Sequence, residues 1–113
     1  MVSGGWITQA GRSRWQQRAV AELAAILAAH PGIPVLAWTV TASGGALSGQ
    51  VLAPAEGGRR GLFGQWQRAL GLEEVTEIPS ATGTPVYLHA RGVRGGVAVS
   101  VTATVFDDEK DRW

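Results

Sequence analysis

Two histidines, His30 and His89, are the side chains best suited to acid–base chemistry in this sequence. His30 stands before Pro31 at the expected end of a helix, where the helix dipole would favour a protonated imidazole, and we interpret it as a capping side chain. His89 lies in an expected strand, and we interpret it as a sheet-surface residue. The chain has no cysteine, which excludes disulfides and cysteine nucleophiles and leaves too few ligands for a metal site.

Clustered carboxylates occur in two places, at residues 73–77 and 107–109. A hydrolase of the glycosidase type needs two carboxylates that converge in a cleft, and neighbouring acids on a loop or tail are usually solvated charges. The sequence also lacks the G-x-S-x-G turn that activates a serine. We therefore expect no enzymatic activity, no catalytic residues and no cofactor.

A glycine-rich segment at residues 56–64 follows an expected strand and opens an expected helix, a context in which backbone amides can hold an anion. Gly57, Gly58 and Arg59 would form such a site. The segment lacks the G-K-[ST] ending of a phosphate-binding loop, and its glycines do not fit G-x-G-x-x-G. We favour a flexible connection with solvated arginines over an anion or nucleotide site.

Nucleic-acid binding is an alternative function, because phosphate neutralisation by basic side chains supplies most non-specific affinity. Residues 1–106 carry eight arginines against five acids, a balance of +3, whereas residues 107–113 carry four acids against two bases, a balance of −2. A balance of +3 is small for a dedicated nucleic-acid binder. The residues that would carry this alternative are Arg14, Arg18, Arg59, Arg60, Arg91 and Arg94.

Five tryptophans are many for 113 residues, and we expect only Trp38 and Trp66 to be needed in the core. Tryptophan is enriched among the residues that dominate protein–protein binding energy. The leading expectation is therefore a non-enzymatic interaction module that binds a protein partner, with self-association as one form of it. The expected partner-binding residues are Trp6, Trp15 and Trp113, with Arg12 and Arg14 as rim contacts.

Composition limits the chain to one compact domain of 113 residues, 45% hydrophobic and 17% charged. The longest apolar stretch, residues 19–29, contains Glu22 and is too short to span a bilayer. No charged and then apolar leader opens the sequence, so we expect a soluble, cytoplasmic domain. Nearly the whole perimeter of residues 19–29 is apolar, which fits either the helix propensity of alanine or a second contact surface.

Hydrophobic periodicity places one helix from Ser13, with Gln16 at capping-box spacing, to His30, and a second at residues 59–70. The first helix has a predicted apolar face, and the second has an apolar stripe and Gly71 as its C′ residue. The predicted helix faces are Trp15, Ala19, Leu23, Ile26, Leu27 and His30 in the first, and Leu62, Phe63, Trp66, Ala69 and Leu70 in the second.

Strands are expected at residues 33–41, 47–53, 86–90 and 97–106, with a short edge strand at 75–78 and a turn at 91–96. The alternation at 97–106 indicates one buried face and one wetter face, which is typical of an antiparallel sheet. We predict an α+β fold of order α-β-β-α-(β)-β-β, with an antiparallel sheet of four or five strands and two helices on one face. The predicted organisation is an N-terminal arm (1–11), one domain (12–106) and an acidic tail (107–113).

The run from His30 to Val40, the segment 47–51 and the A-L-G-L sequence at 69–72 carry a resemblance. Over residues 19–105 the chain resembles small uncharacterised α+β accessory proteins of high-GC bacteria, in which an alanine-rich helix leads through H-P-x-x-P into a hairpin and then a tryptophan-containing helix. The resemblance implies a gene of accessory or mobile-element type. It implies no catalytic residues.

Overall fold

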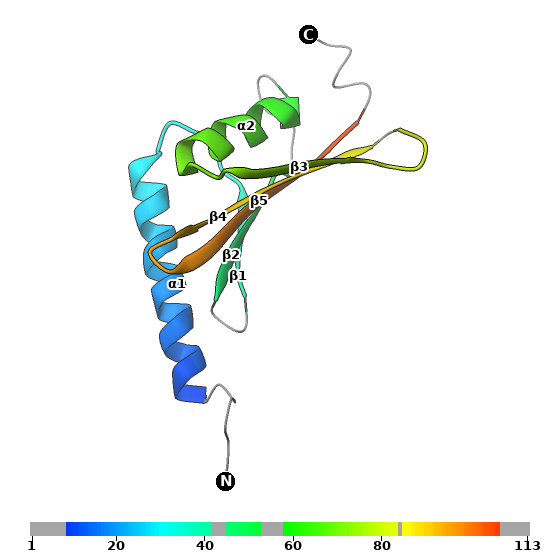
Figure 1. The fold of residues 1–113 in the computed structure, drawn as a ribbon. Helices are drawn as coiled ribbons and strands as arrows, with labels where there is room; N and C mark the ends of the chain where they lie inside the picture. The colour runs from blue at the N-terminus through cyan, green and yellow to red at the C-terminus, as the bar shows by residue number, and fades with distance from the viewer. Residues whose placement is uncertain (1–8, 42–44, 53–57, 84, 107–113) are drawn as a thin grey trace.

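The computed structural model describes residues 9–41, 45–52, 58–83 and 85–106 (Figure 1). Within them the order of elements is α-β-β-α-β-β-β, which confirms the predicted α+β class. The elements are α1 (Gln9–Ala29), β1 (Ala37–Val40), β2 (Ala46–Gln50), α2 (Gly58–Leu70), β3 (Glu74–Pro79), β4 (Val86–Arg94) and β5 (Val97–Val105). Neither described helix combines the length and the apolar character needed to cross a membrane.

The five strands form one sheet in the order β1-β2-β5-β4-β3. The pairs β1–β2, β5–β4 and β4–β3 are antiparallel, but β2 and β5 are parallel, so the sheet is mixed and the prediction of a wholly antiparallel sheet is corrected. The physical reason is that α2 carries the chain from the β1–β2 hairpin to the far edge of the sheet, and β5 then returns beside β2 in the same direction. Alternation along β5 indicates a wet face but does not fix the direction of a neighbouring strand.

Several predicted boundaries are wrong. The strand expected at 33–41 is only Ala37–Val40, and the strand expected at 47–53 ends at Gln50. α1 begins by Gln9 and not at Ser13, so the predicted arm does not extend to residue 11. The Ser13 hydroxyl lies inside the helix and accepts a hydrogen bond of 3.2 Å from the Gln17 side chain, one turn further on. β4 continues to Arg94, so the predicted turn at 91–96 shrinks to Gly95 and Gly96, whose positive φ angles of 58° and 80° suit glycine.

Both helices pack on one face of the sheet and share a single core with the inward side chains of the strands (Figure 1). Trp66 of α2 lies at its centre, only 1% exposed, and its indole Nε1 donates a hydrogen bond of 2.8 Å to the Pro34 carbonyl. The Trp66 ring meets Trp38 edge-on, with ring centroids 5.7 Å apart. The predicted stripe of α2 is thus confirmed. The predicted face of α1 is too wide, since Ala19 and Ile26 are buried but Leu27 is exposed.

Gly49 of β2 packs closely against the side chains of Leu36 and Trp38. A Cβ at this position would lie 2.9 Å from Leu36 Cδ1 and 3.0 Å from Trp38 Cη2. We therefore expect Gly49→Ala to lower the free energy of unfolding by about 1–3 kcal/mol, the usual cost of overpacking. Denaturant unfolding followed by circular dichroism measures this difference.

Gly61→Ala is the matched control, because a Cβ at Gly61 in α2 meets no atom within 4 Å. Alanine in a helix interior is more favourable than glycine by up to about 1 kcal/mol, so this variant should be as stable as the natural chain or more stable. Equal effects of the two substitutions would contradict the packing described around Gly49.

Candidate functional site

The sheet face opposite the two helices, here called the open face, has no helix over it in the part of the chain that the structure describes (Figure 1). The strand registers place the outward side chains of all five strands on it. These residues are Ala37, Thr39, Ala46, Ser48, Gln50, Glu74, Thr76, Ile78, Tyr87, His89, Arg91, Val93, Ala98, Ser100, Thr102 and Thr104.

The middle of the open face is made of small side chains because the sequence of β5 alternates. Its valines and Ala103 point into the core, and the residues between them are Ala98, Ser100, Thr102 and Thr104. Ser100 stands directly beside Ser48 of β2 and Arg91 of β4. Because alanine, serine and threonine side chains project only a short distance from the sheet, a second sheet could pack closely against this face.

Among the described residues of the open face, Glu74 and Arg91 carry the formal charges, and they are directly opposed on β3 and β4. The Arg91 Nε and the Glu74 Oε1 lie 3.4 Å apart, and both side chains are mostly exposed. The exposed large apolar side chains of the face are Tyr87 (47% exposed), Ile78 (55%) and Val93 (72%). The face is therefore nearly neutral, hydroxyl-rich and partly apolar.

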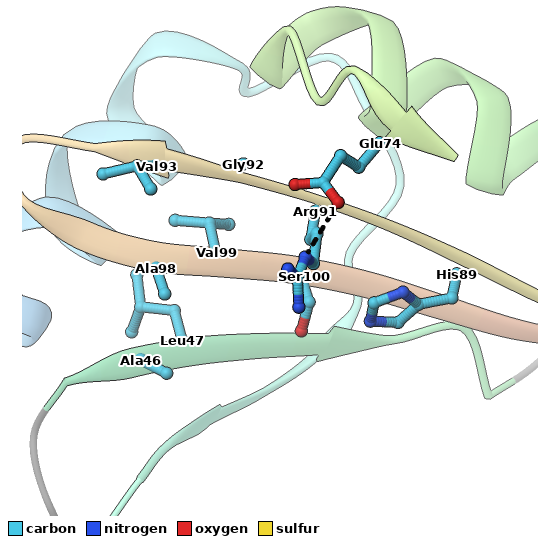
Figure 2. A pocket seen from close by; sticks show the side chains of 10 residues that line it. All are labelled: Ala46, Leu47, Glu74, His89, Arg91, Gly92, Val93, Ala98, Val99 and Ser100. Carbon is cyan, nitrogen blue, oxygen red and sulfur yellow. Dashed lines mark ion pairs between the residues drawn. The ribbon is translucent and has the colours of Figure 1, made fainter. Parts of the chain in front are cut away.

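A shallow hollow of about 380 Å³ opens on this face (Figure 2). Ala46, Ala98 and Ser100 are among its lining residues, as are His89 and Arg91. Figure 2 draws these side chains around the Arg91–Glu74 ion pair. The hollow offers van der Waals contact and a few hydrogen-bonding groups, which suits the side chains of a packed partner.

The sequence interpretation missed the open face as a site. His89 lies on the sheet surface as predicted, half-buried beside Thr76 and Thr102. The alternation at 97–106 does identify the outward side chains of β5. Tyr87 and Val93 carried no signal of their own, because their place beside those side chains depends on the register between β4 and β5.

The predicted partner-binding residues fall in two groups. Trp6 and Trp113 lie outside the described residues. Trp15, Arg12 and Arg14 are exposed on α1, where Trp15 has 40% of its surface accessible. The Arg18 guanidinium lies 4.9 Å from the Trp15 ring centroid, and Gly11, Arg14, Trp15 and Arg18 line a hollow of about 210 Å³.

The arginines of the nucleic-acid alternative are not brought together. Arg14 and Arg18 lie on α1, Arg91 on the open face, and Arg94 between the helices, where it bonds to Glu22 and to the Leu70 carbonyl at 3.4 Å each. The remaining two, Arg59 and Arg60, open α2, and Arg60 is paired with Glu77 at 2.7 Å. This scatter makes no single basic surface for a phosphate backbone.

The anion-site residues are only partly described, since Gly57 lies outside the described residues. Gly58 is the first residue of α2, with a φ of 78°. The Arg59 guanidinium bonds to the Leu52 carbonyl at 3.4 Å and lies 5.5 Å from the Phe106 ring centroid. Arg59 is thus engaged with neighbouring protein groups, which argues against a role in anion binding.

His30 packs edge-on against Trp66, with ring centroids 6.0 Å apart, and is half-buried at the end of α1. Across residues 9–41, 45–52, 58–83 and 85–106, no three histidine or carboxylate side chains lie close enough to share a metal ion. No protein-family model, no curated protein and no solved structure matches this chain. The resemblance to accessory proteins of high-GC bacteria therefore stays a prediction.

Proposed function

We propose that this protein is a non-enzymatic interaction module that forms a homodimer by packing the open faces of two copies against each other. The observation that carries the proposal is the contrast between the two faces of the sheet. One face lies under both helices, whereas the other is uncharged apart from one opposed ion pair, with small side chains in its middle and exposed apolar side chains around them. The accessory type of gene and the cytoplasmic location stay predictions.

The side chains of the open face suit a second sheet. Two sheets pack about 10 Å apart when their facing side chains are small enough to interdigitate. Ser48, Ser100 and Thr102 meet this condition in the middle of the face. Tyr87 and Val93 add apolar surface whose removal from water favours association.

The size of the face is sufficient for a specific but modest interface. Strands of these lengths, rising about 3.4 Å per residue and spaced about 4.8 Å apart, give a flat footprint on the order of 500 Å². Two such faces bury on the order of 1,000 Å², near the lower bound for specific interfaces. We therefore expect reversible dimerisation.

The charge of the open face favours a second copy over a polyanion. A two-fold interface brings the same patch of both subunits together, so the patch must be complementary to itself. Glu74 and Arg91 satisfy this condition because they carry opposite charges. Across the two-fold axis, Glu74 of each copy can face Arg91 of the other. A nucleic acid would gain little from a face with no net positive charge.

Single cysteines test the proposal cleanly, since the natural chain has none. We expect Thr102→Cys, on the open face, to form a covalent dimer with a bismaleimide spacer of about 10 Å, the separation of packed sheets. Val20→Cys is the control, because Val20 is 53% exposed on α1, on the helix side of the sheet. Equal cross-linking of both variants, or none at Thr102→Cys, would overturn the proposal.

A further inference from the structure

The imidazole of His89 lies on the open face, within the area that the proposed dimer covers. The strand register places it between Thr76 of β3 and Thr102 of β5, where it is half-buried. It also lines the hollow of about 380 Å³, on the same side of the sheet as Arg91 (Figure 2). Among the described residues, no side chain forms a hydrogen bond or an ion pair with this ring. Its charge is therefore not fixed by a partner within the described chain.

Few charged or titratable groups face His89 on the open face. Arg91 lies two residues further along β4, and Glu74 of β3 is directly opposed to Arg91, with 3.4 Å between the Arg91 Nε and the Glu74 Oε1. Tyr87 lies two residues before His89, and a phenol is uncharged at neutral pH. The outward side chains of β5 are alanine, serine and threonine, without charge. The carboxylate of the face is thus already paired with a cation.

Protonation of His89 changes the charge balance of the open face. With a neutral imidazole, the charges of Glu74 and Arg91 cancel, whereas a protonated imidazole gives the described residues of the face a net charge of +1. A two-fold interface contains every group twice, so the dimer would hold two carboxylates for four cations. Taking unpaired charges out of water is strongly unfavourable. The dimer should therefore form from chains in which His89 is neutral.

We infer that protonation of His89 in both copies dissociates the open-face dimer, which makes the assembly sensitive to pH. This inference rests on the proposed dimer. The dimer then binds fewer protons than two separate chains, so association weakens as the pH falls. The range is about pH 5 to 8, in which histidine is the side chain that ordinarily changes charge. For two histidines of ordinary acidity that must both be neutral, linkage gives a dissociation constant about 100-fold higher at pH 5.5 than at pH 7.5.

The dissociation constant at two pH values tests the inference. Sedimentation velocity over a concentration series at fixed ionic strength compares pH 7.5 with pH 5.5, and circular dichroism checks that the chain stays folded at both. We expect the natural chain to associate at least about tenfold more weakly at pH 5.5. His89→Gln cannot gain the charge and should lose most of this difference. His30→Gln is the control and should keep the difference, because His30 packs against Trp66 on the helix side of the sheet.

The outcomes separate this inference from the dimer itself. A natural chain that dimerises equally at both pH values overturns the role of His89 and leaves the dimer standing. A pH dependence that persists in His89→Gln, or disappears in His30→Gln, has the same consequence. A natural chain that stays monomeric at pH 7.5 overturns the dimer and this inference together.

Proton uptake is a second measurement that needs no substitution. Calorimetric dilution of the natural dimer in two buffers of different ionisation enthalpy counts the protons that bind when the dimer dissociates. We expect between about one and two protons per dimer at pH 6, taken up by the two copies of His89. Dissociation without proton uptake contradicts the inference, even if His89→Gln fails to dimerise at either pH.

Discussion

Replacing Trp66 with alanine is expected to lower the free energy of unfolding by about 3–5 kcal/mol, which is a large part of the stability of a small domain. Trp66 is almost fully buried and contacts both Trp38 and His30 edge-on. Its loss removes the largest side chain of the core and leaves a cavity that the sheet and α2 cannot close. Denaturant unfolding at one fixed protein concentration measures the change, since dimerisation also adds stability.

Trp66→Phe separates packing from hydrogen bonding at the same position. Phenylalanine keeps an aromatic ring but leaves the Pro34 carbonyl without its 2.8 Å donor. We therefore expect Trp66→Phe to lower the free energy of unfolding by about 1–3 kcal/mol relative to the natural chain, which is less than Trp66→Ala. Trp15→Ala is the matched control, because Trp15 is exposed, and it should change stability by about 0.5 kcal/mol or less. A Trp66→Ala chain as stable as Trp15→Ala would contradict the core described above.

Ser100→Arg is expected to weaken the dimer at least about 100-fold, that is by about 2.7 kcal/mol or more. Ser100 lies at the middle of the open face, directly between Arg91 and Ser48. An arginine there is too long for two sheets at their usual spacing, and it places a like charge beside Arg91. Sedimentation velocity over a concentration series gives the dissociation constant.

The fold of the Ser100→Arg monomer should be nearly unchanged, because the side chain points away from the core. Circular dichroism and thermal unfolding check this point. Val20→Arg adds the same charge on the exposed side of α1 and should dimerise like the natural chain. Equal weakening by the two substitutions would show that net charge, and not the open face, controls association.

The parts of the fold that neighbouring residues determine could be predicted from sequence. The alternation of β5 and the apolar stripe of α2 are both confirmed, because each pattern is complete within one element. Gly71 follows α2 with a φ of 64°, as its predicted C′ role requires. The edge strand around residues 75–78 is also confirmed, as β3.

Features that depend on distant residues could not be predicted. The parallel pairing of β2 with β5 arises because the chain passes through α2 to β3 at the far edge of the sheet before it returns. No local sequence pattern encodes that connection. β4 continues through Gly92 because Val99 of β5 pairs with it and Leu72 packs against it; a Cβ there would lie 3.1 Å from Leu72 Cδ2. The sequence alone makes residues 91–96 resemble a turn.

The candidate site also contains features that could be predicted from sequence and features that could not. The tryptophan argument identified Trp66 as core and Trp15 as a candidate contact, and Trp15 is indeed exposed. The open face remained hidden because it is assembled from single outward residues of five strands. Only the register joins Tyr87, Ser100 and Ser48 into one surface.

The mass of the natural chain in solution tests the central claim most directly. Sedimentation equilibrium from low micromolar to submillimolar concentration should show reversible association that ends at twice the chain mass of 11.8 kDa. Mass that stays at one chain throughout this range would contradict the open-face dimer. Mass that rises past two chains without a plateau would also contradict it, because a two-fold interface closes at the dimer.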